Sequence, residues 1–261
     1  MNRIFSIALL VMMWIATAAG QNEQASALIS EGDRYSEKAF DNQKALASFE
    51  KALKAEPNNA EVLWRISRSY VDIGEHLPAG TKEEKAKQLD YYQKATDFAN
   101  QAIGANPNSS MAYTRRAIAN GRIALFKGIW DALDLVKQVK ADCEKAIQLD
   151  NGNAAAHYVL ARTHYKVCEK PKMIRWPLGL SWGNLDESRA QYEKAIALRP
   201  NFIMYRLDAA RTYVELDEYG LAREQLIKIQ TLGTEDEDDN QFRKEGLGHF
   251  ASLTSFAPRG R

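Results

Sequence analysis

The stretch EKAIALRPNF, from Glu193 to Phe202, decides the fold because three similar stretches precede it in the chain. They are EKALKAEPNN from Glu50, NQAIGANPNS from Asn100 and EKAIQLDNGN from Glu144. Each has a small alanine with a branched residue next to it, followed by a Pro-Asn or Asp-Asn pair at which a helix ends. A helix end that returns at this scale is typical of helical repeat proteins.

The residues around these copies have the spacing of paired amphipathic helices. In the first pair, Gly32 and Ala52 are the small residues at which two helices are expected to approach closely. This order of large, small and aromatic residues resembles the tetratricopeptide repeat, a pair of antiparallel helices of about 34 residues. We predict an all-α solenoid of about five such helical hairpins, the last beginning at Ile203, with a capping helix from Gln241 to Leu253.

The spacing of the copies predicts insertions between the helices of a pair. The matching alanines, Ala52, Ala102, Ala146 and Ala195, are 50, 44 and 49 residues apart, which exceeds the unit of about 34 residues.

We place the three insertions by composition. In the second repeat, the charged connection at residues 75–90 holds Pro78 and Gly80. In the third repeat, no proline occurs, so we expect longer helices with a turn near Lys127 and Gly128. In the fourth repeat, prolines and glycines predict a loop over residues 169–184.

Four sequence features carry a resemblance to a known family. They are AEVLWRISRSY from Ala60, the EKAI copies, GLSWGNLDESRAQYEKAIALRPN and the acidic turn TEDEDD from Thr234 to Asp239. Together they resemble the regulator of microtubule dynamics family and its bacterial relatives, over about Ala25 to Phe250. The resemblance implies a helical binding scaffold and no catalytic residue. The acids of TEDEDD also suit a helix N-terminus, where the helix dipole favours negative charge.

Composition and the absence of catalytic motifs exclude several classes of function. Of 261 residues, 45% are hydrophobic and 26% are charged, so the chain can bury a sizeable core. Lys and Arg number 35 against 34 Asp and Glu, and no basic stripe occurs, so nucleic acid is not an expected partner. The sequence lacks a glycine-rich phosphate loop, a nucleophile elbow and a zinc-protease histidine pair. We therefore expect no enzyme and no cofactor.

The N-terminus has the order of regions found in secretory signals. Arg3 precedes an apolar run from Ile4 to Ile15, and small residues follow up to Gly20. We predict a signal peptide at residues 1–20, a solenoid at 21–254 and a frayed tail at 255–261, with an exported, periplasmic or secreted protein. The alternative is an uncleaved membrane anchor, since about 17 apolar residues can span a bilayer.

The repeat motif also suggests a binding surface, because the first helices of successive repeats line a concave groove in such solenoids. Guanidinium groups beside aromatic faces suit a peptide that carries carboxylates. The alternative is that these arginines are solvated or pair with Asp72, Glu215 or other nearby carboxylates. The expected groove residues are Trp64, Arg68, Arg122, Tyr158, Arg162, Tyr165, Lys166 and Arg211.

We therefore predict a non-catalytic scaffold that binds protein or peptide partners, with acidic segments as one option for the ligand. The alternative is a membrane-tethered structural component, or one that resembles the microtubule regulators. The only membrane contact expected is an uncleaved N-terminus.

The loop MIRWPLGLSWG, from Met173 to Gly183, is too apolar for a freely solvated connection. If exposed, Trp176, Leu178, Leu180 and Trp182 would form a contact site. The interpretation that we favour is that the loop folds back and fills the gap made by its own insertion.

Histidine and cysteine positions offer little chemistry. His164 and Cys168 are four residues apart on one helix, a spacing that can chelate a metal. However, His157 and His164 fall on packing positions of the motif, so we expect packing and no metal site. Cys143 also takes an apolar position, which favours a buried thiol over a disulfide to Cys168.

Overall fold

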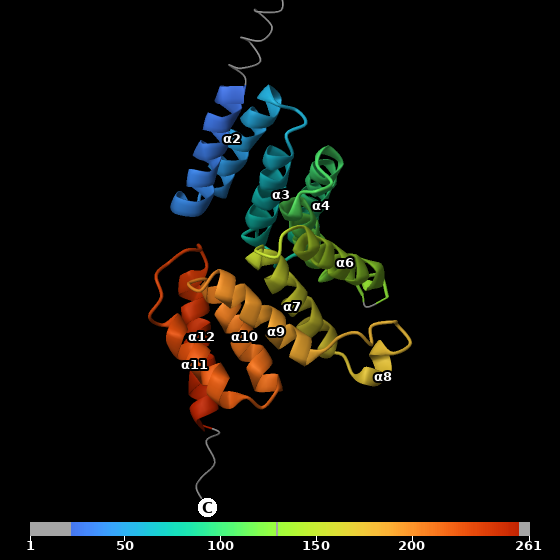
Figure 1. Cartoon of the computed structure of the whole chain (residues 1–261), viewed down its shortest axis with the longest axis vertical. Coiled ribbons are helices and arrows are strands. Elements are labelled where there is room, and N and C mark those ends of the chain that lie inside the picture. The colour runs from blue at the N-terminus through green and yellow to red at the C-terminus, as the bar shows by residue number, and fades with distance from the viewer. Residues whose placement is uncertain (1–21, 129, 256–261) are drawn as a thin grey trace, which may run out of the picture. The chain divides into compact units, whose positions relative to one another are not determined.

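The structure is a computed structural model that describes residues 22–128 and 130–255. Its described residues form helices and turns without any strand, as predicted (Figure 1). They divide into two compact units, with the boundary between Pro107 and Asn108. The predicted signal peptide and most of the predicted tail lie outside the described residues.

Unit 1 contains the first two helix pairs. Residues 22–34 are helical and continue into a π-helical turn, η1 (Tyr35–Ala39). The remaining helices are α2 (Asn42–Ala55), α3 (Ala60–Glu75) and α4 (Lys82–Ala105). α3 packs on both α2 and α4.

Unit 2 contains three further pairs and a terminal helix. α5 packs on α6, α7 on α9 and α10 on α11, while α12 packs on both α10 and α11. The first helices α5, α7 and α10 contact one another in that order, and the terminal helix α12 follows beside α10; we call these four helices the first-helix row. The bounds are α5 (Ser110–Ala124), α6 (Leu133–Leu149), α7 (Ala154–Cys168), α8 (Lys172–Arg175), α9 (Leu185–Leu198), α10 (Ile203–Glu215), α11 (Tyr219–Ile229) and α12 (Asp239–Ser255). The five pairs and the capping helix are thus confirmed.

The four sequence copies end four helices in one register. In each, the alanine is fully buried, and its carbonyl accepts a hydrogen bond of 2.9 Å from the backbone N–H at the helix end. The next helix begins eight residues after each alanine, because the intervening turn is built alike. The alanines are Ala52, Ala102, Ala146 and Ala195, and the helices that follow begin at Ala60, Ser110, Ala154 and Ile203.

The close approach predicted at Gly32 is confirmed. A Cβ atom placed on Gly32 would lie 2.3 Å from the Phe49 ring, and Phe49 itself is buried. Only glycine lets the helix at residues 22–34 come this close to α2.

The insertions are distributed differently from the prediction in two repeats. In the second repeat, α4 begins at Lys82, so much of the charged segment is helix and the connection is short. Thr81 and Glu84 form a capping box there, which starts the helix early. In the third repeat, α5 and α6 have 15 and 17 residues, close to the 16 of α3, so the extra residues lie mainly in the connection at 125–132.

The fourth insertion and the acidic turn agree with the prediction. Residues 169–184 form a connection that contains the single helical turn α8. The acidic turn leads into α12, where the buried Asp239 carboxylate accepts hydrogen bonds from the backbone N–H groups of Glu235 and Asp236. These bonds fasten the turn that starts the capping helix.

Candidate functional site

The predicted groove residues lie in both units, and the two sets are described separately. In unit 1, Trp64 is buried; its indole N–H donates to Glu61 at 3.0 Å, and the Arg65 guanidinium covers its ring at 4.1 Å. Trp64 is therefore not an open aromatic face, which corrects the prediction. Arg68 pairs with Asp72 at 3.3 Å and with Glu37 at 3.2 Å, so the alternative of local ion pairs holds for this residue.

In unit 2, three side chains from two adjacent helices of the first-helix row, α7 and α10, meet at the carboxylate of Asp208. The Asp208 side chain, only 8% exposed, accepts a hydrogen bond of 2.8 Å from the Tyr158 hydroxyl and pairs with Arg211. Arg162 donates to the Tyr158 hydroxyl at 2.8 Å and lies 3.6 Å from Asp208. We call Tyr158, Arg162, Asp208 and Arg211 the Asp208 network.

A second carboxylate, that of Glu245, pairs with this network on its solvent-facing side. Arg211 also pairs with Glu245 of α12, a side chain that is 40% exposed. His249, one turn further along α12, lies 3.7 Å from the same carboxylate. The network thus has an inner acid shielded from water and an outer acid that water reaches.

Tyr158 forms its contacts within the Asp208 network and is not available to bind a ligand. Its ring is buried and stacks on Tyr205 with centroids 4.6 Å apart. Burial raises the pKa of Tyr158, and the nearby Asp208 carboxylate raises this pKa further. The hydroxyl therefore stays protonated and donates to Asp208, which corrects the expectation that Tyr158 faces a groove.

The remaining predicted groove residues are more accessible. Tyr165 is half-buried, and its pKa is raised by burial and then by Glu215. Lys166 is exposed, pairs with Glu169 at 2.7 Å and lies 5.6 Å from the Tyr165 ring centroid. Arg122 lies half-buried in the last turn of α5. Together with Arg162 and Arg211, they are the predicted residues of unit 2 that a ligand could reach.

Sequence reasoning missed the two acids that organise this site. Asp208 follows the buried Leu207 in α10 and was not among the expected groove residues. A signal was present, because Asp208 stands three residues before Arg211 on the same helix face. Glu245 could not be found this way, since its partner lies 34 residues away in the sequence.

The apolar connection at residues 169–184 is divided into an inner and an outer side. Leu178 and Leu180 are buried against Val167, and the half-buried Trp182 packs beside them. This confirms the folding back of the loop, and it corrects the assignment of both leucines to an exposed contact site. Gly179, with φ of +66°, turns the chain between the two buried leucines. Trp176, by contrast, is exposed.

His164 and Cys143 have the packing roles predicted for them. His164 is buried, its ring packs nearly perpendicular to that of Trp182 with centroids 5.1 Å apart, and burial lowers its pKa. His157 is also buried, and its ring contacts Gln191 and the Asn151 carbonyl. Cys143 and Cys168 are free thiols, with Cys143 buried.

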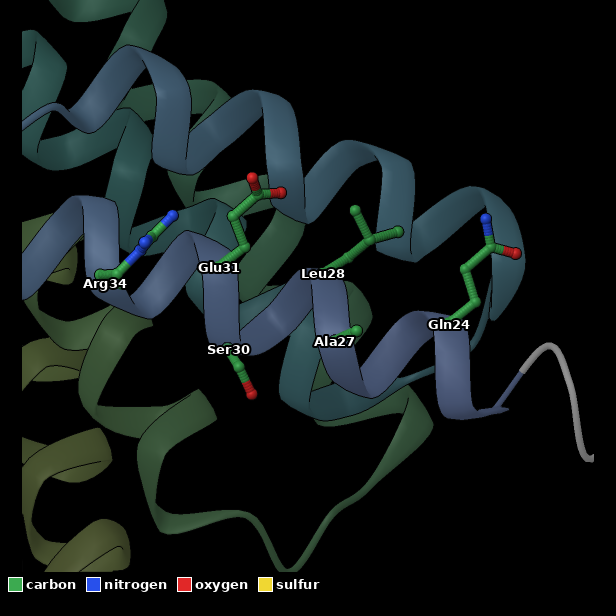
Figure 2. A pocket seen from close by; sticks show the side chains of 6 residues that line it. All are labelled: Gln24, Ala27, Leu28, Ser30, Glu31 and Arg34. Atoms are coloured by element: carbon green, nitrogen blue, oxygen red, sulfur yellow. The ribbon is translucent and has the colours of Figure 1, made fainter.

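A further hollow lies along the helix at residues 22–34 of unit 1 (Figure 2). All of its lining residues come from this one helix, so it is an open helix face rather than an enclosed cavity. Glu31 is partly engaged there, because the Ser48 hydroxyl donates to it at 3.2 Å. The lining residues are Gln24, Ala27, Leu28, Ser30, Glu31 and Arg34.

Comparison with known families identifies the chain. The family model described as regulator of microtubule dynamics protein 1-3 matches residues 28–253. The chain belongs to this family. The match confirms the family suggested by the AEVLWRISRSY, EKAI and TEDEDD features.

Individual members of the family share moderate sequence identity with the chain. Regulator of microtubule dynamics protein 1 of Bos taurus is 28% identical over 199 residues, which cover 73% of this chain and 61% of that protein. The Homo sapiens protein 1 is 27% identical and is covered over 62% of its length. The chain thus spans less than two thirds of these relatives.

A solved structure supports the tetratricopeptide fold. A thermophilic TPR protein of Thermus thermophilus superimposes with a TM-score of 0.63 at 16% identity, covering 85% of this chain and 98% of that one. Within the described residues, no helix has the length and apolar character needed to cross a membrane.

Proposed function

We propose that this family member is a non-catalytic scaffold that binds a protein or peptide segment on the first-helix row of unit 2. The tetratricopeptide fold supports the proposal, because stacked helix pairs present a preorganised extended surface. The observation that carries it is the Asp208 network, in which Arg162 and Arg211 from adjacent first helices converge on one shielded carboxylate. Two guanidinium groups are thereby held in fixed positions.

The outer acid suggests how a ligand would be admitted. Glu245 is more exposed than Asp208, so its side chain can turn into water at little cost. A carboxylate of the partner would then take its place on Arg211, which can hold a carboxylate with two parallel N–H donors. This exchange favours partners that present an acidic residue.

Affinity capture with matched variants tests this function. Extract from the native compartment is passed over the immobilised wild type, Arg162→Ala and Arg211→Ala proteins, and the captured proteins are identified by mass spectrometry. The control is Arg189→Ala, because Arg189 of α9 has the same 33% side-chain exposure as Arg162 and also pairs with an acid, Glu218. We expect a partner that the control retains and both row variants lose. If all four proteins captured the partner equally, the first-helix row would not be the binding surface.

A second measurement addresses the acidic preference. Replacing the competing acid by Glu245→Gln should strengthen binding of an acidic partner, because Arg211 is left without its outer carboxylate. A partner that binds through apolar contacts alone would be unaffected by this change.

The second candidate function is regulation of microtubule dynamics, and the family match over residues 28–253 favours it. Sedimentation of the chain with polymerised tubulin tests it directly. If the chain is absent from the microtubule pellet over a range of salt concentrations, direct microtubule binding is ruled out. The scaffold function is then the remaining candidate.

Export remains a separate proposal. The order of charged, apolar and small residues at the N-terminus supports cleavage before Gln21 and an exported protein. Sequencing the N-terminus of the mature protein decides between Gln21 as the first residue and a retained membrane anchor.

A further inference from the structure

Two connections of unit 2 expose large apolar side chains to water. Between α5 and α6, Trp130 is 72% exposed and Leu125 is 63% exposed. Between α7 and α9, Met173 is 90% and Trp176 is 79% exposed. Phe126 and Ile174 are exposed beside them. Exposed apolar side chains clustered in this way mark a contact surface rather than random surface exposure.

The two connections belong to one edge of the unit. Each joins the first helix of a pair to its second helix, and such connections lie on the same side of stacked repeats. The inner side of the second connection, at Leu178 and Leu180, packs against Leu133 and Val136 at the start of α6. The first connection leads directly into this part of α6, so the two connections are adjacent.

The second connection is held firmly enough to present its outer side chains. Arg175 of α8 is buried and donates a hydrogen bond of 2.8 Å to the Gly183 carbonyl, across the base of the loop. Its guanidinium also contacts Cys168 at 3.4 Å. Arg175, Leu178 and Leu180 are thus buried within the connection, while Met173 and Trp176 are left exposed.

The charges around this apolar edge are mainly positive. Lys127, Lys137, Lys170 and Lys172 are all exposed, and none forms an ion pair within the described part of the chain. The nearby exposed acids without such a pair are Asp131, Asp134 and Glu187. The edge therefore combines tryptophan and aliphatic side chains with an excess of lysine.

We propose that this edge, formed by residues Leu125, Phe126, Trp130, Met173, Ile174 and Trp176, docks on the surface of a bilayer that contains anionic lipids. Tryptophan is favoured at the level of the lipid headgroups, while aliphatic side chains reach the acyl boundary. Lysines next to them are attracted by anionic headgroups. The contact is peripheral and does not depend on the N-terminal segment.

The same charges argue against a second copy of the chain as the occupant. A twofold dimer would bring each edge against itself, so the four lysines of one copy would face those of the other. Juxtaposed like charges oppose such pairing, whereas an anionic bilayer matches them.

Site-specific labelling tests the docking in the full chain. An environment-sensitive fluorophore is attached at Met173→Cys and, as a control, at Ile227→Cys on α11, an apolar side chain that is 53% exposed. Both variants carry Cys168→Ser so that the only other cysteine is the buried Cys143. Because they share one N-terminus, any difference between them is independent of that segment.

The expected result is a blue shift at position 173, and not at 227, with vesicles of phosphatidylcholine and phosphatidylserine. Trp130→Ser and Trp176→Ser, combined in one variant, should weaken this response about tenfold, since each loses an apolar side chain that the lipid would bury. These two side chains are exposed, so the fold should persist, and circular dichroism checks this.

Two results would overturn the proposal. One is an equal response, or no response, at positions 173 and 227. The other is a shift at position 173 that grows with protein concentration in the absence of vesicles, which would assign the edge to a second copy. Lys172→Glu should reduce the response to phosphatidylserine vesicles, and high salt should do the same.

Discussion

The Tyr158 hydroxyl of α7 donates a hydrogen bond of 2.8 Å to the Asp208 carboxylate of α10, and so joins the first helices of two successive pairs. The Asp208 side chain is almost completely shielded from water, yet it balances the charges of Arg162 and Arg211. The bond therefore belongs both to the packing of unit 2 and to the candidate binding surface.

Removing the shared carboxylate should destabilise unit 2. Asp208→Ala leaves two arginines and the Tyr158 hydroxyl without their common partner, and we expect the free energy of unfolding to fall by about 3 kcal/mol. Tyr158→Phe removes one hydrogen bond and should cost about 1 kcal/mol. Urea denaturation measures both. As a control, Asp186→Ala removes an exposed acid 3.6 Å from Arg189 and should cost less than about 0.5 kcal/mol. A loss for Asp208→Ala as small as the control's would contradict the shared role.

A methyl group at Gly32 should open the first helix pair. Gly32→Ala places its Cβ against the Phe49 ring, and we expect a loss of about 1–3 kcal/mol in the stability of unit 1. Gly104→Ala in α4 is the matched control, because its added Cβ would meet no atom within 4 Å apart from the adjacent residues and backbone of its own helix. The control should be neutral or stabilising by about 0.5–1 kcal/mol, since alanine favours the helix. Thermal unfolding followed by circular dichroism compares the two variants.

Stability should also depend on His164 in mildly acidic solution. Burial lowers the pKa of His164 below its ordinary value of 6.5, Lys140 lowers it further, and the acids Glu187 and Glu144 act in the opposite direction. The unfolded chain then binds the proton more readily than the folded chain. The free energy of unfolding should therefore fall as the pH drops below 6.5, until the lower folded pKa is passed.

Urea denaturation across this pH range, on the wild type and on His164→Phe, isolates the contribution of His164. Phenylalanine keeps a ring against Trp182 but cannot take up a proton. A pH dependence that is identical in the two proteins would show that other groups cause it.

The two thiols should react at different rates. Burial raises the pKa of Cys143 well above 9.0, so little thiolate forms and a disulfide reagent cannot reach it in the folded protein. Cys168 is half-buried, and its pKa is raised by burial but lowered again by Arg175. We expect slow reaction of one thiol in the native protein and of both in denaturant. The Cys168→Ser variant should react only in denaturant, and rapid labelling of that variant in buffer would refute the assignment.

The sequence predicted the helix pairs well because the ends of most helices are marked by local sequence signals. The helix ends after Ala52, Ala102, Ala146 and Ala195 were visible as repeated stretches, and the structure keeps them in one register. The start of α4 was missed because Thr81 and Glu84 cap the helix within a segment whose charge suggested a connection. The capping box formed by Thr81 and Glu84 thus starts a helix in a segment that its composition alone assigned to a connection.

The candidate site was harder to predict because its partners come from separate helices. The motif placed Arg162 and Arg211 on first helices, but it could not reveal that both reach Asp208. Likewise, the side-chain pattern could not tell which residues of the apolar loop turn inward. That division follows from the turn at Gly179 and from the space beside Val167, which exist only after folding.

The helix α12 has a consequence for assembly. Its side chains Phe242, Phe250 and Leu253 pack against the core around Leu226 and Ile229, on the face that a sixth helix pair would otherwise cover. Stacked repeats that lack such a cover can join end to end with another molecule and grow into filaments. Because α12 occupies that face, another molecule cannot stack on α10 and α11 there in the manner of a further helix pair.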